Sequence, residues 1–533
     1  MAYYTATDLV NMKLMADAAK VDSDMINNLI NTDRLSQLKS NMAEGEKYYQ
    51  GEHDYLKHKN YYYSGDNTKH EMFSRANNLI PIPFFTLGAN QKRNYMIGKS
   101  PTISVNMPEV IDEENPSKAE QQSIAQQQEF EKLLTGELGK KFVNTLGKCV
   151  IGATTKVIEW LHFYIDQGVK DENGETIENG RLRMVITPSQ QIIPIYDMQY
   201  EDKLIAIIRY YTYQIISGKD VLTRYKVEWW DDKKVTYWEQ SADESWHLDL
   251  NYKVNPYAHW YVANTSSGQK KAHSWGKVPF VPIYNNQQMT NDLQLIKPLI
   301  DAYDKVFSGW ANDLEDIKQL ILVLKGYTGL KDQTKEGLSE LEYFLENLYG
   351  YGAIPLESGG EVNNLKNEIP VDARERFLKL CKDAIHEIGQ IVDVSKVGDG
   401  SITNVVIKSR YAGLDMKVND MISTLEESIE EIMWFVVTWI NFRYNKKFDY
   451  KQVNFTFNKS QIFNEKELVE TMNLIADRID EQTFLENIPF IKNPQEVIKR
   501  KESERKKREE ETIIKLDNVP DEEETPDLEA ESE

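Results

Sequence analysis

The spacing of apolar residues along the chain predicts a helical start followed by a β-rich middle. Apolar positions recur every three or four residues from Leu9 onward, which is typical of amphipathic helices, and this pattern extends to about residue 60. Phe84–Ile97 and Lys118–Leu146 are predicted to be further helices. From Thr154 to Ala263, short runs rich in Val, Ile, Tyr and Trp alternate with turn residues, which predicts an antiparallel β region.

Two helices with similar apolar seams are predicted over 291–317 and 370–394. Their apolar residues are spaced alternately by four and three, as in helices that pack along a seam. The seam residues are Ile300, Tyr303, Phe307, Trp310 and Leu314 in the first helix and Phe377, Cys381 and Ile388 in the second. Pro298 indicates that the first helix either kinks there or begins near it. Residues 318–369, with strand candidates at 320–324 and 352–356, predict a small α/β insertion between the helices.

The last third of the chain combines a very long predicted helix with charged ends. A glycine-containing loop is predicted at 395–404, and the long helix follows from about Val405 to Phe442. Residues 499–508 hold seven Lys or Arg, whereas every charged residue from Asp517 onward is acidic. We expect a solvated acidic tail over 513–533. The fold class predicted from these patterns is α+β and mainly helical.

Composition narrows the classes of function. A hydrophobic content of 41% with ten Trp supports folded cores, and the net charge of −22 argues against a protein that coats DNA. An acidic channel wall would still let DNA slide without holding its phosphates. The only cysteines are Cys149 and Cys381, and no zinc-binding spacing occurs. No secretory pattern is readable at the N-terminus, and the longest apolar run, Ile432–Ile440, is about half a membrane span. We therefore expect an intracellular protein without a membrane segment.

Two motifs for catalysis are incomplete. Gly98-Lys99-Ser100 resembles the end of a phosphate-binding loop, but Arg93 stands where the first glycine is required. His386-Glu387 begins like a zinc-protease helix, but Gln390 replaces the second histidine ligand. We expect no enzyme activity, no cofactor and no metal.

An acidic cluster leaves one enzyme hypothesis open. Asp313, Glu315 and Asp316 are carboxylates of the kind that hold magnesium in nucleases, and they are equally typical of a solvated helix face. A metal-dependent nuclease therefore remains an alternative.

The order of elements and several landmarks resemble the portal protein family of siphovirus-type phages of Gram-positive bacteria. The most specific stretch runs from Trp275 to Lys325, and the resemblance covers most of residues 40–440. The landmarks are Tyr48–His53, Asn77–Pro81, Gly98–Pro101, Leu299–Lys305 and Asn312–Asp316. Ile402–Lys408 departs from the family, which usually shows a Ser-Gly pair followed by small and apolar residues there. The pattern therefore leaves the boundary between loop and long helix open.

The resemblance implies a portal fold with wing, stem, clip and crown regions. Carried onto this sequence, the regions are the wing at 1–290, stem helices at 291–317 and 370–394, the clip at 318–369, a tunnel loop at 395–404, a long helix returning to the wing at 405–450, the crown at 451–512 and the tail at 513–533.

The resemblance also implies a function in the virion. Twelve subunits would form a ring at one capsid vertex, and double-stranded DNA would pass through it during packaging and ejection. The residues expected to face that DNA are Lys396, Val397, Asp399, Ser401 and Lys408. The implied partners are the terminase large subunit, which would supply the ATPase, a head-completion adaptor, the scaffold and the major capsid protein. The protein would assemble in the host cytoplasm without a membrane. Another virion assembly scaffold, without DNA passage, is the remaining alternative.

Overall fold

The structure is a computed structural model, and it describes only part of the residues of the chain. These are 23–63, 69–71, 76–108, 117–166, 169–170, 176–178, 180–197, 203–217, 219–241, 244–263, 270–316, 321–325, 361–365, 370–394, 403–460 and short pieces between 474 and 505. The chain divides into two compact units, Met1–Val392 with Gly413–Ser460, and Asp393–Ala412 with Gln461–Glu533. The elements discussed here lie in the first unit, except for the start of the long helix.

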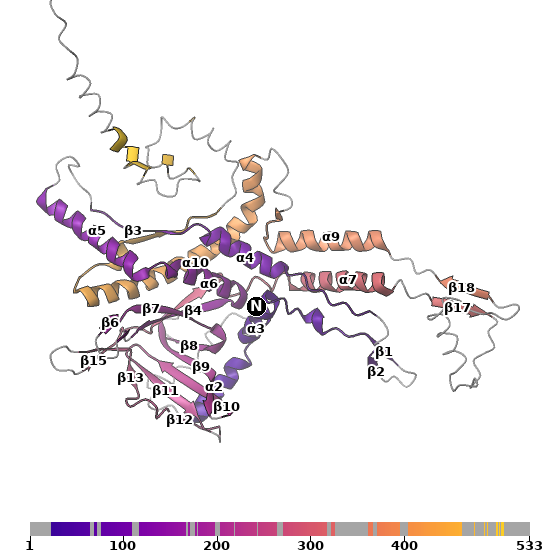
Figure 1. The fold of residues 1–533 in the computed structure, drawn as a ribbon, viewed down its shortest axis with the longest axis horizontal. Helices are drawn as coiled ribbons and strands as arrows, with labels where there is room; N and C mark the ends of the chain where they lie inside the picture. Colours follow the sequence, from indigo (N-terminus) through magenta and orange to yellow (C-terminus); the bar gives the residue numbers. More distant parts are fainter. Residues whose placement is uncertain are drawn as a thin grey trace, which may run out of the picture. The chain divides into compact units, whose positions relative to one another are not determined.

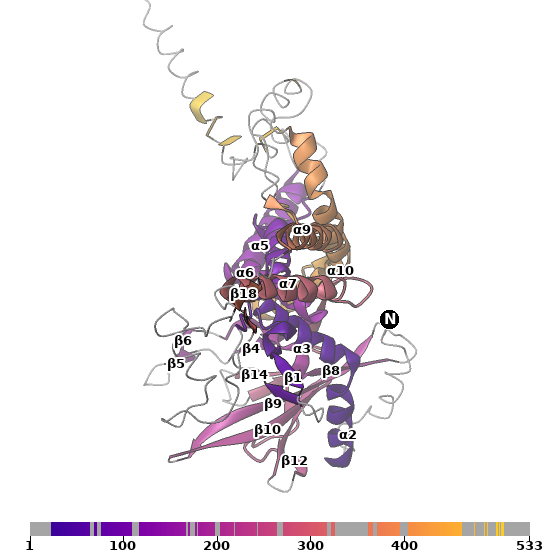
Figure 2. The ribbon, with the colours of Figure 1, turned by 90° about the vertical axis from the view of Figure 1, so that its right-hand side faces the viewer.

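The predicted antiparallel β region forms a six-stranded sheet in the order β12-β11-β10-β9-β8, with β13 paired to β11 (Figure 1). Its strands are β8 (Ile192–Tyr196), β9 (Leu204–Ser217), β10 (Asp220–Trp230), β11 (Lys234–Gln240), β12 (Trp246–Leu248) and β13 (Tyr257–Ala258). Long β9 and β10 lie side by side in Figure 2. Helix α2 (Ser23–Arg34) packs Ile26 and Ile30 against Trp229 and Trp238, which buries this sheet face.

A smaller sheet in the order β16-β4-β7 shares a core with the larger one. Its strands are β4 (Ile158–Ile165), β7 (Leu182–Thr187) and β16 (Phe280–Tyr284). Trp160 and Phe280 pack in one cluster with Trp230 of the larger sheet. Among its described residues, the first unit also has five two-stranded pairs: β1 (Tyr61–Tyr63) with β2 (Lys69–Glu71), β3 (Thr102–Val105) with β19 (Val453–Thr456), β5 (Val169–Lys170) with β6 (Thr176–Glu178), β14 (Trp260–Ala263) with β15 (Lys270–His273), and β17 (Ile321–Lys325) with β18 (Glu361–Leu365).

The N-terminal helices agree with the prediction at one place and differ at another. Helix α3 (Gln37–Tyr49) follows α2, and α4 spans Phe84–Ile97, as predicted. The single helix predicted over 118–146 is wrong: α5 (Lys118–Leu138) ends at Gly139, and α6 (Lys141–Lys156) begins two residues later. Gly139 has a φ of +63°, which a glycine adopts readily and which interrupts the helix.

Helix α10 (Asn404–Tyr444) is 41 residues long, close to the predicted range. From Leu414 onward its buried residues recur every three or four positions and form a stripe of Leu414, Val418, Met421, Leu425, Ile429, Ile432 and Val436. Phe435 stacks on Phe163 of β4 with ring centroids 4.7 Å apart. Ser428 donates a hydrogen bond of 2.7 Å to the Pro282 carbonyl in β16. The apolar run 432–440 is thus a buried helix segment.

Within the described residues, no helix has the length and apolar character needed to span a membrane.

Candidate functional site

Two neighbouring helices, α7 (Lys297–Asp316) and α9 (Val371–Ile388), form the element that carries the predicted site (Figure 1). An ion pair between Asp313 and Arg374 joins the last turn of α7 to the first turn of α9, so the helices run antiparallel. Beyond them, β17 (Ile321–Lys325) pairs antiparallel with β18 (Glu361–Leu365). The predicted second strand at 352–356 lies outside the described residues. Pro298 is the second residue of α7, where a proline costs no helical hydrogen bond.

The predicted seam residues differ in burial within the chain. Ile300 and Cys381 are buried, and Tyr303, Phe307 and Trp310 are partly buried. Leu314, Phe377 and Ile388 are 56%, 41% and 48% exposed. On α9 the residues buried in the chain are Leu378, Cys381 and Ile385. Packing of the exposed seam residues against a second subunit stays a prediction.

The polar face of α7 holds an extended segment from the N-terminal part of the chain. Asp304 Oδ1 accepts a hydrogen bond of 2.9 Å from the backbone N–H of Ile82, and Ser308 Oγ accepts one of 3.0 Å from Ile80. One turn further along, Asn312 Oδ1 accepts from the backbone N–H of Asn78 at 2.5 Å. We call residues 78–82 with these three side chains the α7 clamp. It joins three of the sequence landmarks, because the segment 78–82, most of which belongs to Asn77–Pro81, contacts both Leu299–Lys305 and Asn312–Asp316.

A buried polar cluster extends the clamp toward α3. Asp304 Oδ2 lies 2.5 Å from His53 Nδ1, and both side chains are fully buried. His53 stacks on Tyr48, with ring centroids 4.6 Å apart, and the Tyr48 hydroxyl donates to Asp301. The Lys297 ammonium lies 3.1 Å from Asp301, which together with nearby Asp54 raises the pKa of this lysine even though its partial burial opposes the charge. The landmark Tyr48–His53 is therefore fixed to α7 as well.

A second buried cluster ties α4 to α10 and to the turns before α7. Asp292 lies 2.8 Å from Lys417 and 3.3 Å from Lys92. Burial alone raises the Asp292 pKa, but the two ammonium groups outweigh it and lower the pKa to about 2. Burial lowers the pKa of Lys92 to about 8 despite Asp292. Lys417 also donates to the Gly389 carbonyl at the end of α9, so the cluster positions both α9 and α10.

The acidic cluster behind the nuclease hypothesis is engaged in contacts with other parts of the protein. Asp313 pairs with Arg374, and Glu315 accepts a hydrogen bond of 2.8 Å from the Asn78 side chain. The Asp316 side chain lies outside the described residues. Among the residues that the structure describes, no group of three or more His, Cys, Asp or Glu is arranged to hold a metal ion. Asp313 therefore makes a helix-to-helix contact, and Glu315 makes a contact between α7 and the N-terminal segment.

Most of the predicted tunnel loop lies outside the described residues. Lys396, Val397, Asp399 and Ser401 lie outside the described residues. Lys408 is exposed in the second turn of α10. Their contact with DNA stays a prediction.

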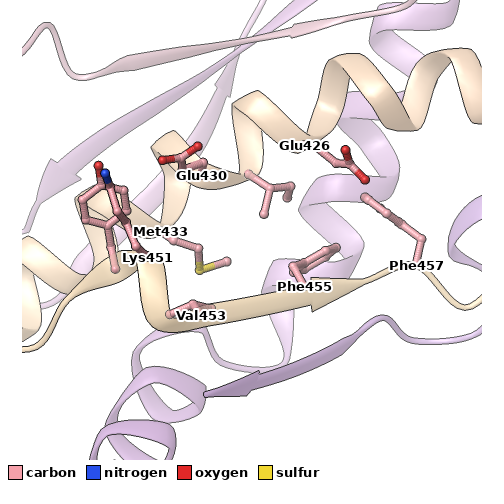
Figure 3. A pocket seen from close by; sticks show the side chains of 9 residues that line it. Glu426, Glu430, Met433, Lys451, Val453, Phe455 and Phe457 are labelled. Carbon is pink, nitrogen blue, oxygen red and sulfur yellow. The ribbon is translucent and has the colours of Figure 1, made fainter. Parts of the chain in front are cut away.

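A groove between α10 and β19 is the other open feature (Figure 3). It has a volume of about 420 Å³, with Glu426 and Glu430 on α10 and with Met433, Phe455 and Phe457 facing the space between helix and strand. The groove combines two exposed carboxylates with an apolar floor. The sequence pattern did not predict this groove.

Sequence reasoning also missed the α7 clamp and the Asp292 cluster. The available signal was polar residues of α7 spaced by four, at 304, 308 and 312, beside the apolar seam. That signal does not identify a partner more than two hundred residues away in sequence.

Comparisons with known proteins agree with this arrangement. The family described as "Phage portal protein, SPP1 Gp6-like" matches residues 30–512. The portal protein of Bacillus phage SPP1 is 27% identical over 511 residues, covering 94% of this chain and 90% of that protein. The portal protein of Clostridium phage phiCD119 is 26% identical over 461 residues, covering 83% of this chain and 91% of that protein. Because the family match spans the sheets, the α7–α9 pair and the long helix, the chain belongs to the SPP1 Gp6-like family of phage portal proteins.

Proposed function

We propose that the chain is the ring-forming portal subunit of a phage capsid, with twelve copies surrounding a channel for double-stranded DNA. The observation that carries this proposal is the antiparallel α7–α9 pair, which supports the two-stranded extension β17–β18, in a chain that matches the portal family over residues 30–512. The helix pair is fixed to the rest of the subunit at one end and continues into a strand pair at the other. Such a pair can form the wall of a channel when it is repeated around a symmetry axis. The exposed Leu314, Phe377 and Ile388 supply apolar surface for such lateral contacts.

The regions inferred from the sequence are proposed for the assembled ring. The wing comprises 1–290, the stem comprises 291–317 and 370–394, and the clip comprises 318–369. Residues 395–404 line the narrowest part of the channel, 405–450 return to the wing, and 451–512 form the crown before the tail at 513–533. Helices α7 and α9 fall inside the two stem ranges, which supports this division.

The proposed partners include one that supplies the energy for DNA packaging. Its phosphate-loop-like motif is incomplete at Arg93, so packaging energy comes from a terminase large subunit that docks on the clip. A head-completion adaptor, the scaffold and the major capsid protein complete the set of partners. The protein resides at one vertex of the virion capsid and assembles in the host cytoplasm.

Charge reversal in the tunnel tests the DNA-channel role. Lys396→Glu combined with Lys408→Glu replaces two cations per subunit by two anions, which changes the charge of the proposed channel wall by four units per subunit and by 48 units in a ring of twelve. We expect normal rings but altered packaging or retention of DNA, because the altered wall repels phosphates. The measurement is the amount of DNA per particle and the infectivity. Lys203→Glu with Lys233→Glu, two exposed positions on the wing, is the matched control. Unchanged packaging in the tunnel variant would contradict the proposed role of these residues.

A further inference from the structure

A basic cavity lies where α5 ends and α6 begins, beside β7 and the last turn of α10. Its volume is about 700 Å³. The lining contains six cationic side chains and a single carboxylate, Glu137. The cationic residues are Lys132, Lys140, Lys141, Arg181, Arg183 and Arg443. Such a concentration of positive charge is unusual in a chain whose net charge is −22.

The contacts around the cavity neutralise only part of this charge. The Glu137 carboxylate accepts hydrogen bonds from Arg443 and Trp439, both at 3.2 Å, and from the Tyr444 hydroxyl at 3.1 Å. Arg183 pairs with Asp166 at 2.6 Å. In the described part of the chain, Lys132, Lys140 and Lys141 are exposed and form no ion pair. The cavity therefore has an excess of positive charge that an anionic ligand would neutralise.

The surroundings of these lysines favour carboxylates on a peptide over the phosphates of a nucleic acid. Helix α6 begins at Lys141 without a side-chain cap, so the positive end of its dipole adds to the lysines. The cavity is also lined by apolar side chains, among them Leu133, Phe142 and Met184. A nucleic-acid backbone offers no apolar group for such a lining, whereas a peptide with acidic and aliphatic residues matches both features.

We propose that this cavity binds the acidic C-terminal segment, residues 517–533, of a second copy of the chain. That segment contains nine Asp or Glu and no Lys or Arg, and Leu528 stands between Asp527 and Glu529 as an apolar anchor. The inference rests on the ring of the proposed function, because a segment passed from each copy to the next repeats around a closed ring. Assembly also raises the local concentration of the segment at its neighbour's cavity.

Disulfide trapping in the full-length protein tests this proposal and identifies the source of the segment. One chain carries Lys140→Cys, a second carries Leu528→Cys, and the two are mixed before assembly. Native Cys149 and Cys381 are buried and leave the introduced thiols as the accessible pair. We expect covalent dimers of the two chains under mild oxidation, with a yield that falls several-fold in 0.5 M salt because exposed charges are screened. Imaging of the same samples reports ring formation independently.

Matched variants separate this site from general electrostatics. Adding Lys132→Glu and Lys141→Glu to the Lys140→Cys chain should reduce the cross-linked fraction at least fivefold. Lys203→Glu with Lys233→Glu changes the net charge equally on exposed wing positions and should leave it unchanged. Intact rings without cross-linked dimers would overturn the proposal. A double variant, with both cysteines in one chain, that cross-links only within that chain would overturn the assignment to a second copy. Absence of rings would instead contradict the proposed function.

Discussion

Asp292 is a buried carboxylate whose charge is stabilised by two lysines from distant parts of the chain. Lys92 comes from α4 and Lys417 from α10, and the side chain of Lys92 is almost fully buried. Because the folded pKa of about 2 lies below the ordinary 3.8, the Asp292 carboxylate contributes stability above about pH 4. That contribution is lost as the pH falls through 2. The sequence contains all three residues but no pattern that links them.

Replacing Asp292 by Asn leaves two ammonium groups without their carboxylate. We expect the free energy of unfolding at pH 7 to fall by about 3–5 kcal/mol, the usual cost of breaking a buried ion pair from one side. The difference between wild type and variant should shrink between pH 4 and pH 2, measured by chemical denaturation. Glu427→Gln, at an exposed position of α10, is the control and should be neutral. Equal stability of D292N and wild type at pH 7 would show that the cluster does not hold these helices.

Helix α7 makes contacts through two faces, and the sequence pattern predicted only one of them. The apolar seam follows from spacing, and Ile300 at its start is buried as a seam residue should be. The adjoining face bears the α7 clamp, whose partners lie in a segment 222–234 residues away. On α9, the stripe that is buried within the chain consists of Leu378, Cys381 and Ile385. The predicted stripe shares only Cys381 with it, because Phe377 and Ile388 are exposed. Both stripes fit a helical period, so spacing alone does not choose between them.

The α7 clamp should protect the backbone amides of the segment that it holds. Ser308→Ala with Asn312→Ala removes the side-chain acceptors of the Ile80 and Asn78 N–H groups. Loss of about 1–1.5 kcal/mol per hydrogen bond predicts roughly tenfold faster hydrogen exchange at these amides. Lys305→Ala, on an exposed part of the same helix, should leave exchange unchanged. Unaltered exchange in the double variant would mean that the segment is held by other contacts.

At the scale of the whole molecule, long periodic elements were predictable and pairing between distant segments was not. Phe84–Ile97 and the long helix follow from local periodicity, and the antiparallel sheets follow from short apolar strands between turns. The break at Gly139 was missed because a glycine is also tolerated inside a helix. The observed partner of β17 is β18 at 361–365, where only Val362 and Leu365 of the five residues are apolar, so the apolar signal is weak. The proposed tunnel residues before 403 remain predictions.

The exposed seam residues should matter to assembly more than to the folding of one chain. Phe377→Glu with Ile388→Glu places charges on α9 surface that the chain itself leaves exposed. We expect a thermal midpoint within a few degrees of wild type, since surface substitutions usually change stability by less than about 0.5 kcal/mol. Ring yield in size-exclusion chromatography should fall severalfold, because charges would be buried between subunits. Val371→Glu with Leu380→Glu, at positions that are 46% and 69% exposed but outside the predicted seam, is the matched control. A variant that assembles normally would remove this face from the subunit contact.

The most direct test of the portal account is the mass and shape of the purified full-length protein. Native mass spectrometry and negative-stain imaging should show a closed ring of twelve 61.9 kDa chains, about 740 kDa in total, with an axial hole. The hole should be wide enough for duplex DNA. A protein that stays monomeric or dimeric both alone and when co-expressed with its capsid and scaffold partners would contradict the ring, and with it the proposed channel.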